Sequence, residues 1–120
     1  DDMLKEIIKY FSKKINQAVS YKINDMIIDP GFGFAKDLKQ NYNLLSNIDL
    51  LKILEKPIMV GISRKSMIYQ SLKTNAKESL NGTTVLNTVS LIKGASILRV
   101  HDVKEANECI KLINALNKQG

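Results

Sequence analysis

Apolar positions along this chain alternate between helical spacing and short continuous runs. Four segments repeat apolar residues at helical spacing, at residues 3–19, 37–54, 78–94 and from 102 onward. Three short apolar runs lie between them, at 25–29, 57–63 and 95–100. These runs are too short for helices and stand beside Pro or Gly, which is typical of buried strands. The pattern therefore predicts alternating helices and strands, with a short helical turn at 66–72.

The helical segments carry expectations about their buried faces and their ends. In the second segment the expected buried face is Leu38, Leu44, Leu45, Ile48 and Leu51. The third segment is expected to be one helix despite Gly82, and to stop at Gly94. Asp102 and Glu105 have the Asp-x-x-Glu spacing of a capping box, so we expect them to open the last helix.

Strands that alternate with helices imply a parallel sheet with right-handed crossovers. The predicted strand ends recur roughly every 35 residues, the length of a βαβ unit. Three such units could form half of an open sheet or part of a (β/α)8 barrel. A complete barrel needs about 250 residues, so a chain of 120 residues would hold about half of one.

Each predicted strand ends in polar residues, at the edge where parallel α/β folds bind ligands. On the third strand, Arg99 and His101 share one face, which indicates an anion site. The alternative is an Arg held by an internal carboxylate next to a satisfied core His. Charge inside a buried strand is costly unless it is paired.

The second strand leads into a turn with two cations, within the sequence "GISRKS". Gly61 leaves space for the backbone to lie close to a ligand. Arg64 and Lys65 precede a helix start at Ser66, a suitable place for a carboxylate or phosphate. The alternative is a simple Ser N-cap with solvated Arg64 and Lys65.

The first strand ends at Asp29, in the sequence "DPGFGFAK". An ionised Asp accepts two hydrogen bonds side by side, which suits the amidine-like edge of a pterin or guanine. The alternative is a helix cap or a turn cap. The two glycines lack the third glycine of a dinucleotide fingerprint and the ending of a P-loop. We expect them instead to fold a loop over the site and to position Phe32, Phe34 and Lys36.

Composition narrows the class of protein. Hydrophobic residues make up 44% and charged residues 25% of the chain, as in soluble globular domains. No apolar run approaches the ~20 residues of a membrane span. The net charge is +6, but the lysines are scattered and aromatic residues make up only 6%, so we expect no nucleic-acid partner. The single cysteine, Cys109, is expected in the core and fits a reducing, cytoplasmic compartment. No residues have metal-ligand spacing, and no nucleophile–base pair is visible.

Three motifs, "DPGFGFAK", "GISRKS" and "LRVHDV", resemble the C-terminal half of the dihydropteroate synthase family in order and spacing. The resemblance covers essentially the whole chain and corresponds to about strands 6 to 8 of the family's (β/α)8 TIM barrel. It implies that residues 1–120 form a single partial domain of a transferase in folate biosynthesis. The implied reaction condenses 6-hydroxymethyl-7,8-dihydropterin pyrophosphate with p-aminobenzoate, giving 7,8-dihydropteroate and pyrophosphate, with sulfonamides as competitors.

The resemblance also implies roles for individual residues. These are pterin binding by Asp29, Gly61 and Lys65, p-aminobenzoate binding by Phe34 and Ser66, and pyrophosphate binding by Arg99 and His101. Lys65, Arg99 and His101 would be catalytic. Magnesium would arrive with the pyrophosphate and find its ligand outside this segment. The family is commonly a homodimer through its last helices.

Two other readings remain open on the sequence alone. A pterin-binding methyltransferase of the folate–corrinoid type would use a similar acid, but it does not account for "SRKS" or for the Arg/His pair. A non-catalytic binding fragment is the second. Because the chain begins within a helix and lacks the family's early strands, we expect a piece of a longer protein that is inactive by itself.

Overall fold

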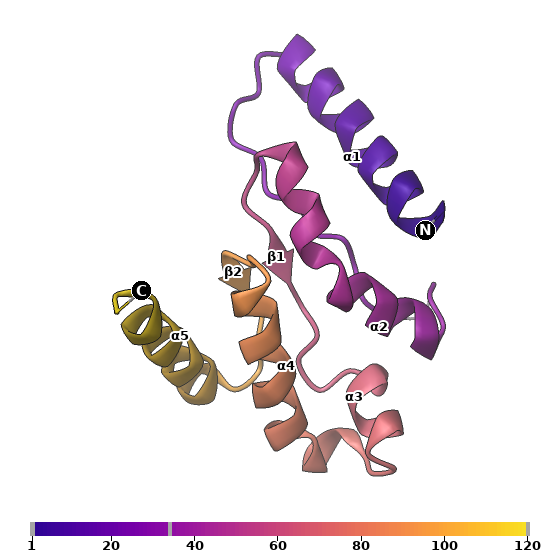
Figure 1. Ribbon diagram of the computed structural model, residues 1–120. Coiled ribbons are helices and arrows are strands. Elements are labelled where there is room, and N and C mark those ends of the chain that lie inside the picture. The colour runs from indigo at the N-terminus through magenta and orange to yellow at the C-terminus, as the bar shows by residue number, and fades with distance from the viewer. Residues whose placement is uncertain (1, 34, 120) are drawn as a thin grey trace.

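The computed structural model describes residues 2–33 and 35–119, and its ribbon is mostly helical (Figure 1). The α-helices are α1 Asp2–Ser20, α2 Leu38–Ser46, α3 Ser66–Ser71, α4 Leu80–Ile92 and α5 Val103–Asn117. The 3-10 helices are η1 Ile48–Leu54 and η2 Ala76–Glu78. The strands are β1 Met59–Val60 and β2 Ile97–Leu98. None of the described helices is both long and apolar enough to cross a membrane.

The strands are parallel, as the alternation predicted, but much shorter than predicted. In β1 and β2, Met59 pairs with Ile97 and Val60 with Leu98. The run 25–29 contributes only an isolated parallel bridge between Ile28 and Ile58. The prediction of a fully buried strand there is wrong: Ile28 is buried, whereas the Ile27 side chain is 52% exposed. Only Ile28 finds backbone partners on the neighbouring segment, so the ladder ends after one residue.

The predicted helix at 37–54 is two elements, because the α-helix stops at Asn47. The side-chain amide of Asn47 donates to the carbonyl oxygen of Asn43 at 2.9 Å, a local bond that competes with regular helix. The chain then continues as η1. Four of the five leucines and isoleucines predicted to be buried are at most 3% exposed. The exception is Leu38, at the first position of α2, which is 39% exposed.

Of the two predicted helix ends, the one at Gly94 is confirmed and the one at Asp102 is wrong in its capping. The stop of the third segment at Gly94 is confirmed: α4 ends at Ile92 and Gly94 takes a φ of +110°. The capping box at Asp102 is wrong, since its side chain makes no hydrogen bond to the start of α5. Its carboxylate binds Arg64 instead. A capping box does occur at α2, between Asp37 and Gln40.

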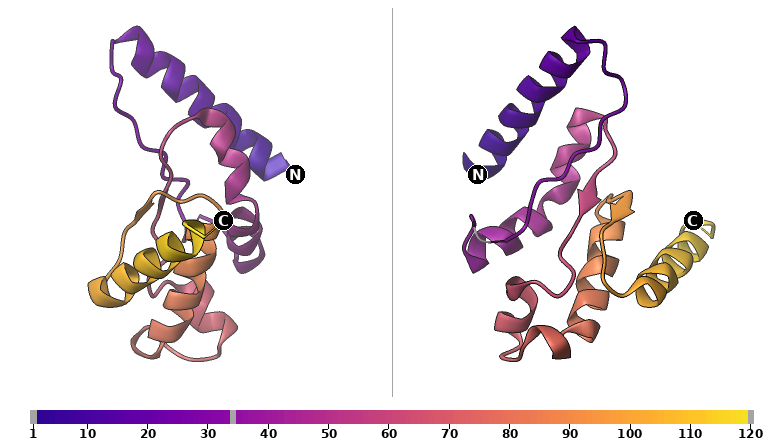
Figure 2. Two further views of the ribbon diagram at one scale, coloured as in Figure 1. Left: turned by 60° about the vertical axis from the view of Figure 1, so that its left-hand side comes forward. Right: turned by 180° about the vertical axis from the view of Figure 1, so that it is seen from behind.

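The core surrounds the short parallel strands. The hydrophobic residues that are 2% exposed or less come from the strand segments, α2, η1 and α3: Leu44, Ile48, Leu51, Ile58, Val60, Ile62, Met67 and Ile68. Helices α1 and α5 lie on opposite sides of the strands (Figure 1, Figure 2). Cys109 is buried, as expected, and its thiol is free. The loops that follow the strands are therefore left together at one edge, and they carry the polar residues.

Candidate functional site

The structure brings five polar residues from three strand ends together: Asp29, Ser63, Lys65, Arg99 and His101. We refer to them as the strand-end cluster. Arg99 Nη1 lies 3.0 Å from Asp29 Oδ2, across 70 positions of sequence. Ser63 Oγ lies 2.9 Å from His101 Nδ1, and Lys65 Nζ donates to the carbonyl oxygen of Phe32 at 2.6 Å. Each strand end is therefore tied to another by a side chain of the cluster.

Asp29 uses its two carboxylate oxygens differently. Oδ1 accepts the backbone N–H of Gly31 at 3.1 Å, so the turn-cap alternative holds for this oxygen. Oδ2 accepts from the guanidinium of Arg99. A guanidinium presents planar N–H donors, as an amidine-like edge does. The Asp29 carboxylate was predicted to bind the amidine-like edge of a ligand, and in this structure it binds the similar guanidinium of Arg99.

Gly61 explains how Arg99 reaches this position. A Cβ at Gly61 would lie 2.5 Å from Arg99 Nη2, closer than real Cβ atoms approach. The space that the sequence suggested for a ligand is filled here by the guanidinium. Arg99 is not enclosed in a buried strand, because 57% of its side chain is exposed. The ion pair with Asp29 therefore lies in contact with solvent.

Ser63 fixes the orientation of His101. The Ser63 hydroxyl accepts the backbone N–H of His101 at 3.2 Å and also contacts Nδ1. Where the hydroxyl donates to Nδ1, the proton of a neutral imidazole sits on Nε2. His101 then offers a donor to an anion. Gly61, Ser63, Lys65, Arg99, Val100 and His101 line a cavity of about 130 Å³.

Lys65 also lines a second cavity, of about 370 Å³. Its lining residues are Phe32, Gly33, Arg64, Lys65, Ser66, Tyr69 and Ala76. Burial lowers the pKa of Lys65, the positive charge of Arg99 lowers it further, and Asp29 opposes the shift. Lys65 thus belongs to both cavities and links them.

Ser66 is the first residue of α3, and Lys65 holds the N-cap position. The alternative of a simple Ser N-cap is therefore wrong. Within the described part of the chain, the Ser66 hydroxyl has no hydrogen-bond partner. It lines the second cavity and is available to a ligand there.

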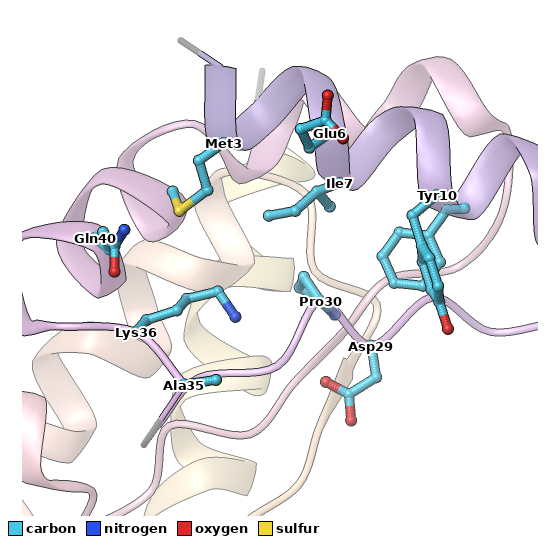
Figure 3. Close-up of a pocket in the computed structure, with 10 residues that line it drawn as sticks. Met3, Glu6, Ile7, Tyr10, Asp29, Pro30, Ala35, Lys36 and Gln40 are labelled. Atoms are coloured by element: carbon cyan, nitrogen blue, oxygen red, sulfur yellow. The ribbon is translucent and has the colours of Figure 1, made fainter.

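A larger cavity, of about 620 Å³, lies between α1 and the loop at 29–36 (Figure 3). Figure 3 shows Ile7 and Met3 reaching from α1 toward this loop, while the Asp29 carboxylate points away from the helix. Lys36 Nζ donates to the carbonyl oxygen of Gly31 at 2.9 Å. The carboxylate therefore faces the strand-end cluster and the apolar α1 side chains do not.

The loop at 29–36 depends on a residue that the sequence analysis missed. Asn41 is 3% exposed, and its Oδ1 accepts the backbone N–H of Gly33 at 3.2 Å. Its amide also donates to the carbonyl oxygens of Gly33 and Lys36, both at 3.4 Å. The only signal in the sequence is an Asn four residues after the capping Asp37. Phe34, predicted to bind p-aminobenzoate, lies outside the described residues.

Arg64 is also bonded rather than solvated, contrary to the alternative considered above. Its guanidinium binds both carboxylate oxygens of Asp102, at 2.9 and 3.0 Å. This hydrogen bonding lowers the pKa of the Asp102 carboxyl and raises that of Arg64. Asp102 directly follows His101, so the pair adjoins the strand-end cluster.

Comparison with known proteins shows which family this chain resembles. The family model "Pterin binding enzyme" matches residues 1–101. The dihydropteroate synthase of Escherichia coli K12 is 38% identical over 117 residues, which cover 96% of this chain and 42% of that protein. The bifunctional dihydropteroate synthase/dihydropteroate reductase of Helicobacter pylori is 34% identical, over 98% of this chain and 31% of that protein. The chain thus spans less than half the length of these relatives.

Solved structures agree with the sequence relatives. The Yersinia pestis dihydropteroate synthase with a sulfonamide drug is 37% identical, with a TM-score of 0.95 over 100% of this chain and 44% of that one. The Thermus thermophilus enzyme in complex with 6HMPPP is 30% identical, with a TM-score of 0.90 over 98% of this chain and 47% of that one.

Proposed function

Since this chain belongs to the pterin-binding enzyme family, we propose that it forms the substrate-binding portion of a dihydropteroate synthase. It is a portion of a (β/α)8 barrel, as the family resemblance implied. The proposed protein joins a dihydropterin pyrophosphate to p-aminobenzoate as a transferase of folate biosynthesis. The observation that carries this proposal is the strand-end cluster, in which an acid already holding an amidine-like donor adjoins two cation-lined cavities.

The pterin is assigned to Asp29, Gly61 and Lys65. Its amino-pyrimidinone edge replaces the Arg99 guanidinium on Asp29, because both are planar N–H donors and the guanidinium makes a single hydrogen bond there, from Nη1 to Oδ2. The ring then occupies the space above Gly61, which no Cβ fills. Lys65 Nζ, now 2.6 Å from the carbonyl oxygen of Phe32, donates to the ring from the side.

The p-aminobenzoate is assigned to the cavity of about 370 Å³. The Ser66 hydroxyl and the Lys65 cation suit its carboxylate, while Phe32 and Tyr69 offer apolar surface to its ring. A sulfonamide would compete for the same cavity. Phe34 is retained as a proposed contact.

The departing pyrophosphate is assigned to Arg99 and His101. Its negative charge grows as the bond between the pterin methylene carbon and the pyrophosphate oxygen breaks. The aniline nitrogen then forms a bond to that carbon and releases its proton to solvent. Arg99 and His101 stabilise the charge on the leaving group, and the pterin and p-aminobenzoate sites hold the two reacting atoms together.

Magnesium belongs to this proposal only as a companion of the pyrophosphate. No group of three His, Cys, Asp or Glu side chains in the described ranges 2–33 and 35–119 could hold a metal ion. The strand-end cluster offers a pyrophosphate two cations and an imidazole, whereas its one carboxylate, Asp29, already binds Gly31 and Arg99. The proposal therefore keeps the metal ligand outside this chain segment. It also keeps a homodimer and a cytoplasmic location, which the buried free thiol of Cys109 suits.

The substitution Asp29→Asn tests the proposal in the native full-length protein. One acceptor of the carboxylate becomes a donor, so pterin affinity should fall roughly 10- to 100-fold. Asp25→Asn is the matched control, because Asp25 is an exposed acid of the same segment. Isothermal titration with a pterin measures the affinity of both variants. Unchanged pterin affinity in Asp29→Asn would show that Asp29 has another role.

Labelled p-aminobenzoate separates the two enzymatic readings. A dihydropteroate synthase binds it and incorporates the label into dihydropteroate when the pterin pyrophosphate is present. A pterin-binding methyltransferase does neither, because its reaction expels no pyrophosphate and uses no aniline.

A further inference from the structure

The side chain of Arg64 joins three separate segments of the chain. It follows β1, and its Nε and Nη2 bind the two carboxylate oxygens of Asp102, in the loop after β2. Its Nη1 donates to the carbonyl oxygens of Ala76 and Lys77 in η2, both at 2.8 Å. Four directed hydrogen bonds from one planar guanidinium fix the positions of these segments relative to one another.

The residues beside these contacts belong to the proposed site. Lys65 and Ser66 directly follow Arg64, and His101 directly precedes Asp102. Ala76 lines the same cavity as Lys65 and Ser66. Any movement of the Arg64–Asp102 pair would therefore displace the groups assigned to p-aminobenzoate and to pyrophosphate.

Several features indicate that this contact is made at the expense of local structure. Asp102 occupies the N-cap position of α5, yet its side chain caps nothing and binds Arg64. Arg64 takes a φ of +56°, an unfavourable conformation for a residue with a Cβ. The Arg64 backbone N–H is satisfied by the Oγ1 of Thr83, which is 2% exposed. Asp102 therefore does not cap α5, and Arg64 keeps an unfavourable backbone conformation. Both features accompany a guanidinium that is held in one position.

We infer that Arg64 is a positioning residue, which through Asp102, Ala76 and Lys77 holds Lys65, Ser66 and His101 in the geometry required for transfer. This inference rests on the proposed function. Asp29 is not among the groups that Arg64 fixes, since it lies on another strand end and its carboxylate binds Gly31 and Arg99. Pterin binding and transfer should therefore respond differently to the loss of Arg64.

The test compares Arg64→Ala with Lys77→Ala in the native full-length protein. The Lys77 side chain is exposed and only its backbone carbonyl contacts Arg64, so this control removes a nearby cation but keeps the bond. Arg64→Ala should lower kcat on the order of 100-fold and raise the KM for p-aminobenzoate. The Kd for a pterin without pyrophosphate should rise by less than about fivefold, because only the Lys65 contact moves while Asp29 and Gly61 keep their positions. Lys77→Ala should leave all three values near those of the wild type.

Two further variants separate positioning from folding. Arg64→Lys should recover only a minor part of kcat, because an ammonium cannot span a carboxylate and two carbonyls in a fixed plane. Arg64→Ala combined with Asp102→Asn should be no slower than Arg64→Ala alone, since the two residues act as one unit.

The outcomes are distinct. An active wild type with unchanged kcat in Arg64→Ala overturns the inference alone. A parallel loss of pterin affinity, kcat and thermal stability in Arg64→Ala also overturns it, because it shows a general structural role. A wild type that forms no dihydropteroate overturns the proposed function, and this inference with it.

Discussion

In this structure Asp29 and Arg99 bind each other, and each thereby occupies the other's proposed substrate-binding group. The carboxylate binds a guanidinium where the proposed pterin edge belongs, and the guanidinium binds a carboxylate where the proposed pyrophosphate belongs. The Arg99 side chain is 57% exposed and the Asp29 side chain 35% exposed. An exposed ion pair of this kind contributes only about 0–1 kcal/mol to the stability of the fold. The pair is therefore weak enough for a substrate to separate it. On separation, both of its members become free to bind the same substrate molecule.

Arg99→Ala should consequently affect two pterins in different ways. A pterin without pyrophosphate should bind as well as to the wild type, or up to about fivefold more tightly, because nothing competes for Asp29. The pyrophosphate-bearing substrate should bind at least about tenfold more weakly, because it loses a charge-assisted contact. Titration of both ligands against both proteins measures the difference. Equal losses for the two ligands would contradict the assignment of Arg99 to pyrophosphate.

Lys65 leads to a prediction about pH. Its folded-state pKa lies below the ordinary lysine value, chiefly because of burial and also because of Arg99. The charged donor is present below that lowered pKa and is lost as the pH rises through it. The alkaline decline of kcat/KM should therefore come at a lower pH than an ordinary lysine would give. Lys65→Arg, which stays charged, should move the decline to higher pH.

Lys65→Met provides the comparison for this pH profile. At pH values below the alkaline decline, this variant should have a kcat/KM roughly 10- to 100-fold lower than the wild type, because the charged donor is missing at every pH. An alkaline decline that Lys65→Arg does not move must come from another group.

The sequence pointed to four of the five residues of the strand-end cluster, all but Ser63, but not to their bonds. Asp29, Lys65, Arg99 and His101 could be singled out because a polar residue at the end of an apolar run has few structural reasons to be there. The ion pair between Asp29 and Arg99 joins two strand ends far apart in the chain, which no local pattern encodes. The same limit explains the error at Asp102, where the spacing of a capping box is present and a distant arginine takes the carboxylate instead.

Among the elements, helices were predicted better than strands because their hydrogen bonds are local. Helix α1 covers the expected segment, and α4 stops where Gly94 indicated. Strands form only where a neighbour offers backbone partners, so three predicted runs became two strands of two residues and one bridge. The break of the second segment at Asn47 depends on a side-chain bond that hydrophobic periodicity does not detect.

Gly82 in α4 shows how one element positions another. A Cβ at this residue would lie 2.5 Å from Cγ2 of Ile68 in α3 and 2.9 Å from Cδ1 of Leu72. Leu72 is 56% exposed and can turn away, whereas Ile68 is 2% exposed and cannot. The close contact of α4 with α3, which begins at Ser66, therefore needs a glycine.

Gly82→Ala should lower the free energy of unfolding by about 1 kcal/mol. Overpacking against Ile68 costs about 1–3 kcal/mol, and the better helix propensity of alanine returns up to about 1 kcal/mol. Asn81→Ala, on the exposed face of the same helix, gains propensity without a clash and should be neutral or slightly stabilising. Urea denaturation of the native full-length protein measures both. A rise in midpoint for Gly82→Ala equal to that of Asn81→Ala would rule out the close packing.

For the whole molecule, the 120 residues are less compact than an independent domain of this size. The radius of gyration is 15.1 Å, where roughly 13.6 Å is expected for a compact domain. Large apolar side chains that are more than half exposed occur on both sides of the strands: Tyr10, Val19, Tyr21, Ile27, Ile53, Leu72, Val85, Ile92, Val103, Leu112 and Leu116. A sheet of two short strands and one bridge is only marginally stable on its own. The shape is that of a barrel portion whose apolar surfaces need further partners.

The 120 residues expressed on their own should therefore form no measurable dihydropteroate. The strand-end cluster contains an acid and three cationic or imidazole groups, and it lies beside two cavities. The sheet that positions these side chains pairs only two residues of each strand, so few backbone hydrogen bonds hold them in place. The isolated chain should also unfold at a lower urea concentration than the native full-length protein, because less apolar surface is buried per residue. A coupled assay with labelled p-aminobenzoate measures turnover, and circular dichroism in urea measures stability. Dihydropteroate formation by the isolated chain that disappears in its Asp29→Asn variant would show that this portion of the barrel is active without the remainder.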